Sequence, residues 1–152
     1  MWIVVCTVII AAIFGGDMWI KNRIERTGVE GKTRKILGGR LIIGKHHNRG
    51  AILNLGQKNR PLVACVSVAM TVVMFFLFVL SLGRHGNGLL RVALSMILGG
   101  AFSNTYDRLK RKYVVDYVSF NTPGKYFKRV IFNISDFCII IGALLAALAV
   151  GR

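Results

Sequence analysis

Apolar residues along this chain form four blocks, which are separated by basic connections that contain glycine. The blocks cover residues 2–20, 62–82, 89–106 and 130–150. A helix needs roughly 20 mostly apolar residues to cross about 30 Å of hydrocarbon, and each block approaches that length. The pattern predicts an all-α membrane protein with four transmembrane helices. The second and fourth blocks are the most continuously apolar, whereas Arg91 and Asn104 interrupt the third.

The connection between the first two blocks, residues 21–61, contains too many glycines for a long helix. Two short apolar pieces within it, residues 39–44 and 50–55, are bounded by glycine, which indicates strands. We expect this loop to form a small extramembrane β-sheet at the membrane surface. It has too little apolar surface for a core of its own, so residues 1–152 are expected to form a single integral-membrane domain.

The first block could instead be a cleaved signal peptide. It lacks a basic n-region, and Phe-Gly-Gly-Asp at residues 14–17 is a poor cleavage site. Three further apolar blocks follow it, so a retained helix is the favoured interpretation.

The formal net charge of +15 suggests nucleic acid at first sight. The cations accompany long apolar blocks and no RNA- or DNA-binding motif, so we expect anionic lipid headgroups as partners and no nucleic acid. The three cysteines lie in three different blocks, without pairing or metal-ligand spacing. The adjacent His46 and His47 would point in opposite directions on an extended segment. We therefore expect no metal and no cofactor.

All four aspartates lie at the ends of apolar blocks, where an ionisable group is costly and becomes a candidate functional residue. Asp116 follows the third block, and Asp136 lies about one turn into the fourth. Antiparallel helices joined by one connection bring these positions to the same membrane face. Two carboxylates that meet there share a proton and can act as acid and base, as in aspartic proteases. Two separately solvated interfacial aspartates are the alternative that spacing leaves open.

Polar residues accompany both carboxylates at helical spacing. Asn104 and Asp107 are three residues apart, and the adjacent Arg108 can bind a carboxylate or backbone carbonyls. These residues could contact substrate, or they could form hydrogen bonds and an ion pair at the helix end, and the sequence leaves both roles open. Asn133 precedes Asp136 by three residues and could position a peptide or the other carboxylate.

Asp17 and Lys21 end the first block with i, i+4 spacing. That spacing is typical of a helical ion pair. A structural role is favoured over a catalytic one, because a paired charge is a low-cost way to end a span.

Five motifs follow one another along nearly the whole chain. They are Asp17-x-x-x-Lys21, Asn48-Arg49-Gly50-Ala51, Gly-Gly-Ala-Phe-Ser-Asn-Thr-Tyr-Asp-Arg at 99–108, Val-Val-Asp-Tyr-Val at 114–118, and Phe-Asn-Ile-Ser-Asp at 132–136. In this order and spacing they resemble lipoprotein signal peptidase (signal peptidase II), a family of four-span aspartic proteases. The family cleaves diacylglyceryl-modified prolipoproteins immediately before the lipidated cysteine, and its loop after the first span forms a small sheet on the outer membrane face.

The resemblance implies a role for each matched residue. The catalytic pair would be Asp116 and Asp136. The residues that hold substrate would be Asn48, Asn104, Arg108 and Asn133, and supporting residues would be Asp17, Lys21 and Asp107. The implied partners are prolipoproteins and membrane lipids. The protein is expected to be a monomer without a metal, in the bacterial cytoplasmic membrane.

Three positions depart from the family's usual residues. Ser103 stands where glycine is usual, Ile52-Leu53 where Ala-Phe is usual, and Ser135 where alanine is usual. All three lie near the expected cleft, so they bear on substrate preference more than on the reaction.

The distribution of Lys and Arg conflicts with the family's topology. Eleven lie between Lys21 and Pro61 and seven between Asp107 and Arg129, against two around the second connection. The positive-inside rule would place both large connections in the cytoplasm. The family instead has cytoplasmic termini and an active site towards the outer face, and we follow it because the lipidated substrate lies in the outer leaflet.

Two other classes of protein are compatible with parts of this pattern. A four-span transporter or proton-coupled carrier would use membrane aspartates as proton relays. A structural assembly factor would explain the basic connections but not the aspartates. The aspartates cluster at helix ends and no internal repeat is evident, so a peptidase is favoured over a carrier.

Overall fold

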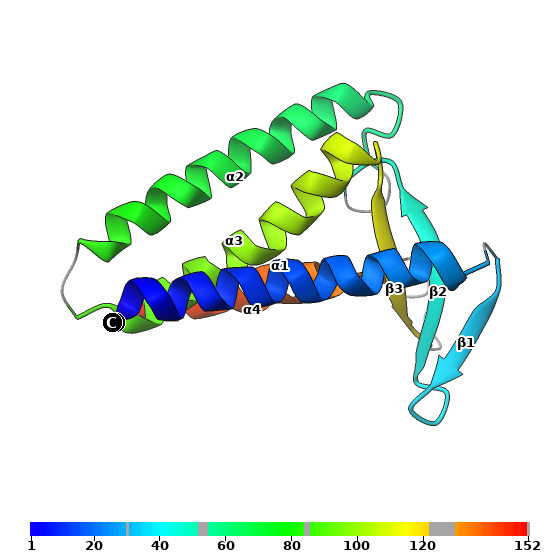
Figure 1. The fold of residues 1–152 in the computed structure, drawn as a ribbon, viewed down its shortest axis with the longest axis horizontal. Coiled ribbons are helices and arrows are strands. Elements are labelled where there is room, and N and C mark those ends of the chain that lie inside the picture. The colour runs from blue at the N-terminus through cyan, green and yellow to red at the C-terminus, as the bar shows by residue number, and fades with distance from the viewer. Residues whose placement is uncertain (30, 52–54, 84–85, 122–129, 152) are drawn as a thin grey trace.

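The computed structural model describes residues 1–29, 31–51, 55–83, 86–121 and 130–151. The described residues form four helices, α1 (Trp2–Thr27), α2 (Arg60–Leu82), α3 (Gly88–Lys110) and α4 (Ile134–Val150). They also form four strands, β1 (Thr33–Ile36), β2 (Leu41–Asn48), β3 (Val114–Phe120) and β4 (Ile131–Phe132). The helices extend lengthwise from the sheet, and the start of α1 lies near the C terminus at the opposite end (Figure 1).

The predicted helices are all present, with different ends. α1 continues to Thr27 and α3 to Lys110, beyond the apolar blocks, while α4 begins only at Ile134. Residue Asn133 accounts for the late start of α4, because its side chain accepts a hydrogen bond from the backbone N–H of Asp136 and caps the helix. The preceding residues are used in β4.

Among the described helices, α1 and α2 are long and apolar enough to cross a membrane. α4 is also apolar, but with 17 residues it is shorter than these two helices. Large apolar side chains cover the outside of α2, where Phe76 and Leu80 are 61% and 64% exposed. An exposed apolar surface of this extent requires an apolar environment, which agrees with a membrane protein.

α3 is the central helix, and close backbone approach holds its neighbours against it. A Cβ on Gly99 would lie 2.9 Å from Cβ of Ile13 on α1, and a Cβ on Gly142 of α4 would lie 2.8 Å from the carbonyl oxygen of Ala93. Small residues at such crossings are the usual means of packing membrane helices. Residue Cys6 is completely buried in this core, as expected for a small apolar side chain.

The sheet is antiparallel in the order β1-β2-β3-β4. The sequence prediction was therefore incomplete, because β3 and β4 come from the third connection and not from the loop after α1. It also missed β1. The strand predicted at residues 39–44 corresponds to β2 but was ended too early, since β2 runs to Asn48. In the piece expected at 50–55, the described residues lie in bends and turns, and Ile52-Leu53 falls outside the described residues.

A β-bulge between Ile43 and His46 shifts the register of β2 against β3. The extra residue reverses which face each later side chain occupies, and bulges commonly re-aim side chains beside active sites. Beyond the bulge, Asn48 shares a face with Asp116, while His47 points to α1, where its Nε2 lies 2.7 Å from Glu25 Oε1. The two histidines thus point apart, as predicted.

Candidate active site

Asp116 lies in the buried part of β3, with 2% of its surface exposed. Asn48 Nδ2 donates to Asp116 Oδ2 at 3.0 Å, and Asn133 Nδ2 donates to Asp116 Oδ1 at 2.8 Å. The first of these bonds depends on the bulge in β2, and the second on the cap of α4. Asp116 is therefore held by two segments that are far from it in the sequence.

Asp136 belongs to a capping box at the start of α4. The backbone N–H of Asn133 donates to Asp136 Oδ2 at 3.0 Å, and the backbone N–H of Asp136 donates to Asn133 Oδ1 at 2.9 Å. A carboxylate in the first turn of a helix also faces the positive end of the helix dipole. Because Asn133 binds both carboxyl groups, it brings Asp116 and Asp136 into one site.

Asn104 makes the third link between these residues. Its Nδ2 donates to Asp136 Oδ1 at 2.9 Å, and its Oδ1 accepts hydrogen bonds from Asn133 Nδ2 at 3.2 Å and from Lys21 Nζ at 2.9 Å. An ammonium group has donors only, so the amide oxygen must face Lys21. The amide N–H₂ of Asn104 is thereby turned towards Asp136.

Burial raises the pKa of Asp116 to about 7, and the nearby Asp136 carboxylate raises it as well. The hydrogen bonds from Asn48 and Asn133 act in the opposite direction, because they stabilise the ionised form. With this raised pKa, Asp116 keeps its proton to a higher pH than an ordinary aspartate does. One carboxyl group can then donate a proton while the other accepts one.

Asp17 and Lys21, which the sequence paired, form a completely buried ion pair with a distance of 2.7 Å from Nζ to Oδ2. Asp107 Oδ2 lies 3.2 Å from the same ammonium and accepts the backbone N–H of Val115. Lys21 therefore sits between two carboxylates. Its position next to Asn104 makes it part of the support of the site.

Sequence reasoning missed three further side chains that donate hydrogen bonds to Asp17. Ser103 Oγ and Ser135 Oγ both donate to its Oδ2 at 2.6 Å, and the Tyr117 hydroxyl donates to its Oδ1 at 2.8 Å. The two departures at 103 and 135 thus converge on one buried carboxylate. Burial raises the pKa of Tyr117, which keeps its hydroxyl protonated as a donor. The unusual serines were visible in the sequence, but their common partner was not.

Arg108 lies one turn beyond Asn104 on α3 and joins that helix to the end of β2. Its guanidinium donates to the carbonyl oxygens of Asn104 and Gly50, each at 3.3 Å. Arg108 therefore holds backbone on one side of the site. No three His, Cys, Asp or Glu side chains among the described residues are grouped so that they could hold a metal ion.

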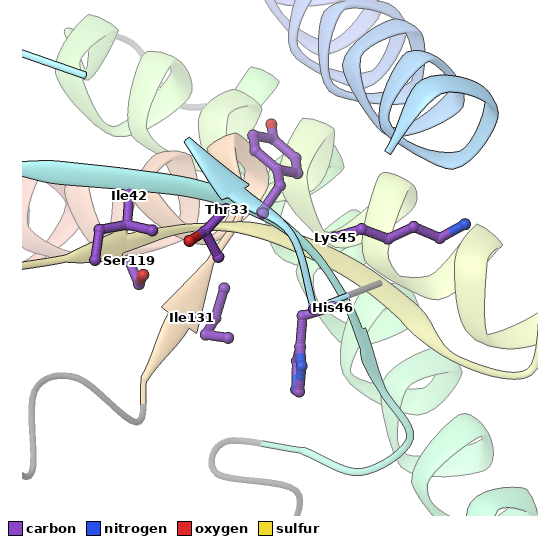
Figure 2. A pocket seen from close by; sticks show the side chains of 9 residues that line it. Thr33, Ile42, Lys45, His46, Ser119 and Ile131 are labelled. Carbon is purple, nitrogen blue, oxygen red and sulfur yellow. The ribbon is translucent and has the colours of Figure 1, made fainter. Parts of the chain in front are cut away.

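A cavity of about 220 Å³ lies on the sheet and is lined from all four strands, including Thr33, Ile42, Ser119 and Ile131 (Figure 2). His46, the register partner of Asp116, also lines it. Neither Asp116 nor Asp136 is among its described lining residues. The network of asparagines, and not this cavity, therefore defines the candidate active site.

The model of the family "Signal peptidase (SPase) II" matches residues 9–151. The chain belongs to the signal peptidase II family. A lipoprotein signal peptidase of Mesorhizobium japonicum is 31% identical over 144 residues, which cover 95% of this chain and 83% of that relative. A lipoprotein signal peptidase of Clostridium tetani is 35% identical over 99 residues, or 64% of this chain and 61% of that relative.

A solved structure described as a bacterial membrane enzyme has the same fold. It superposes with a TM-score of 0.83 at 25% identity, covering 96% of this chain and 87% of that one. Membership in the signal peptidase II family confirms the peptidase activity that the motifs predicted. The protein removes signal peptides from prolipoproteins.

Proposed function

We propose that Asp116 and Asp136 are the catalytic pair of an aspartic endopeptidase that cuts diacylglyceryl-modified prolipoproteins before the lipidated cysteine. The observation that carries this proposal is the shared hydrogen bonding of Asn133, which binds both carboxyl groups. Two further asparagines, Asn48 and Asn104, each bind one of them. This arrangement holds two carboxylates together while leaving them able to exchange protons.

In this mechanism the ionised carboxylate takes a proton from a water molecule, whose oxygen attacks the scissile carbonyl carbon. The protonated carboxyl group gives its proton to the carbonyl oxygen, which yields a neutral tetrahedral diol. The C–N bond then breaks as the new amine receives a proton from the first carboxyl group and the second recovers one from the diol. The pair returns to its initial state with one proton.

Arg108 and the asparagines would align the substrate peptide beside the pair. Arg108 holds the carbonyl oxygen of Gly50 and so fixes the backbone just beyond β2 beside the pair. All residues of the pair and its support come from one chain, which is consistent with an active monomer.

We further propose that all four helices cross the membrane, with the sheet and the catalytic pair at the outer face. The start of α1 and the C terminus lie together at the end of the helices away from the sheet (Figure 1), which supports termini on one side and the site on the other. The positive charge of the connections would then face anionic headgroups.

Substitution of the pair tests the assignment. Asp116→Asn and Asp136→Asn, each purified in detergent and mixed with a lipidated precursor, should lose cleavage by about 10³-fold or more, because each lacks the acid or the base. Glu25→Gln makes the same carboxylate-to-amide change outside the pair and should cleave within a few fold of the unchanged protein. The readout is the mass of the precursor over time.

Thermal unfolding and precursor binding must remain similar in both aspartate variants, so that loss of cleavage reports chemistry. Normal processing by either variant would reject the mechanism. Ion-dependent flux in vesicles that both substitutions abolish would instead support the carrier alternative.

A further inference from the structure

Tyr117 follows Asp116 directly on β3 and is buried, with 3% of its surface exposed. Its hydroxyl accepts a hydrogen bond from the backbone N–H of Ile134 at 3.1 Å and donates one to Asp17 Oδ1 at 2.8 Å. A phenolic hydroxyl has one proton, and a backbone N–H group can only donate. The proton of Tyr117 is therefore directed to Asp17, while its oxygen faces the start of α4.

The contact with Ile134 falls on the first residue of α4. Backbone N–H groups in the first turn of a helix have no acceptor within the helix, and Tyr117 supplies one for Ile134. Asp116, the preceding residue of β3, accepts a hydrogen bond from Asn133, the residue just before α4. Two consecutive residues of β3 thus hold two consecutive residues at the start of α4. Asp136 lies two residues further along, so this contact bears on where its carboxyl group lies.

Asp17 provides the fixed end of this contact. Its carboxylate is completely buried and pairs with Lys21 at 2.7 Å, one turn further along α1. Ser135 Oγ also donates to Asp17 Oδ2, at 2.6 Å. The first turn of α4 is therefore tied to α1 twice, directly through Ser135 and indirectly through the hydroxyl of Tyr117.

We propose that the Tyr117 hydroxyl is a positioning group for the cleavage reaction. Together with Ser135 it fixes the first turn of α4 on Asp17, and this sets the place of Asp136 beside Asp116. The inference rests on the proposed catalytic pair, because Tyr117 acts through Asp136. Burial and the Asp17 carboxylate raise the pKa of Tyr117, so the hydroxyl keeps its proton and takes no part in the proton transfers.

The variant Tyr117→Phe tests this role, because it keeps the ring and removes only the hydroxyl. Its kcat for a lipidated precursor should fall by about tenfold to a hundredfold, since small misplacements of a catalytic group are costly. Its KM should change by less than about twofold, because the hydroxyl acts on the catalytic pair and not on substrate binding. Both values come from the mass of the precursor over time at a series of precursor concentrations.

The pH profile of the same variant separates positioning from simple stabilisation of the fold. The charged or titratable groups around Asp116 are Asp136 on α4, Lys21 on α1, Arg108 on α3 and the register partner His46 on β2. Of these, only Asp136 belongs to the segment that Tyr117 holds. Its carboxylate raises the pKa of Asp116, so its displacement should lower that pKa. The alkaline limb of kcat/KM should therefore move to lower pH, by about half a unit or more.

Two control variants remove a hydroxyl elsewhere. Tyr106→Phe makes the same chemical change on α3, at a residue that is 43% exposed, and should keep kcat within about twofold. Thr71→Val removes a buried hydroxyl of α2, which lies 2.9 Å from Thr105 Oγ1 on α3. It should lower the thermal stability, as Tyr117→Phe does, but leave kcat and the pH profile unchanged.

An unchanged kcat in folded Tyr117→Phe would overturn the proposal. So would a loss of kcat that Thr71→Val reproduces at an equal loss of thermal stability. A raised KM with unchanged kcat would show that Tyr117 contacts substrate from the cavity that it lines, and would also overturn it.

Ser135→Ala is the second variant, and it decides the matter if Tyr117→Phe does not fold. It removes the other tie between α4 and Asp17, so it should lower kcat by about fivefold and move the alkaline limb in the same direction. An unchanged kcat and profile would overturn the proposal. Asp116→Asn and Asp136→Asn are assayed in parallel. Cleavage by either would reject the catalytic pair itself, whereas their inactivity beside a normal Tyr117→Phe would reject only the positioning role.

Discussion

At the scale of single residues, the environment of Asp116 predicts how cleavage depends on pH. Its pKa is raised to about 7, and the active pair needs one proton. As the pH rises through that value the second carboxyl group ionises, and the pair loses the acid that protonates the substrate carbonyl. The value of kcat/KM should therefore fall on the alkaline side, by about tenfold at about pH 8 relative to its plateau.

This profile is measured with lipidated precursor at limiting concentration, using a buffer series of constant ionic strength. Glu25→Gln should give the same profile, because Glu25 pairs with Lys45 and His47, away from the pair. A rate that stays level from about pH 6 to about pH 8.5 would contradict a shared proton.

Lys21 is the residue whose loss should disturb stability most. Its ammonium binds Asp17 and Asp107, and all three side chains are completely buried. Lys21→Met would leave the buried Asp17 without a cation, while Asp107 would keep Arg111, whose Nε lies 3.3 Å from its Oδ1. This should cost about 3–5 kcal/mol of unfolding free energy. Denaturant unfolding in detergent measures this cost.

The double variant Asp17→Asn/Lys21→Met should be more stable than Lys21→Met alone, since the uncompensated charge of Asp17 is removed. Lys21→Met should also lower kcat, because the amide of Asn104 loses the donor that fixes its orientation towards Asp136. Wild-type stability in Lys21→Met would show that the buried ion pair is not needed.

At the scale of elements, the contact between α3 and α4 decides whether the two halves of the site meet. A Cβ on Gly100 would lie 2.5 Å from the carbonyl oxygen of Ser135 and 2.9 Å from Cγ1 of Ile139. Gly100→Ala should therefore push α4 away, costing about 1–3 kcal/mol of stability and most of the activity, since Asp136 follows Ser135 directly.

Gly15 on α1 provides the matched control. A Cβ added there meets nothing within 4 Å, so Gly15→Ala should keep full activity and stabilise the helix by about 0.5–1 kcal/mol. Thermal unfolding and precursor cleavage are measured for both variants. Similar behaviour of the two would contradict the close approach of α3 and α4.

At the scale of the whole molecule, the proposed orientation can be tested directly. The C terminus lies at the end of the helices away from the sheet (Figure 1), so it should be cytoplasmic if the catalytic pair faces outward. A C-terminal fusion to a fluorescent protein that matures only in the cytoplasm should therefore be bright, and a fusion to a phosphatase active only outside should be inactive. The reverse result would follow the Lys and Arg count and overturn the orientation.

The sequence by itself determined the helices and the family, and it named the residues that we propose for the site. The apolar character of a block is the sum of its own residues and does not depend on distant parts of the chain. The ends of α2 were therefore predicted to within two residues from its composition alone. Asn133 and Asp136 are three residues apart, and their capping box is a local pattern as well. The motifs around Asp116 and Asp136 were therefore readable without any knowledge of the packing.

Only the tertiary structure decided which partners these residues have. Ser135 reaches Asp17 across 118 positions of sequence, and Tyr117 reaches it across 100. The bulge that turns Asn48 towards Asp116 depends on pairing with β3, a strand that was interpreted as part of a basic connection. Hydrogen bonds of this kind depend on how helices and strands pack, and local hydrophobic pattern carries no information about that packing.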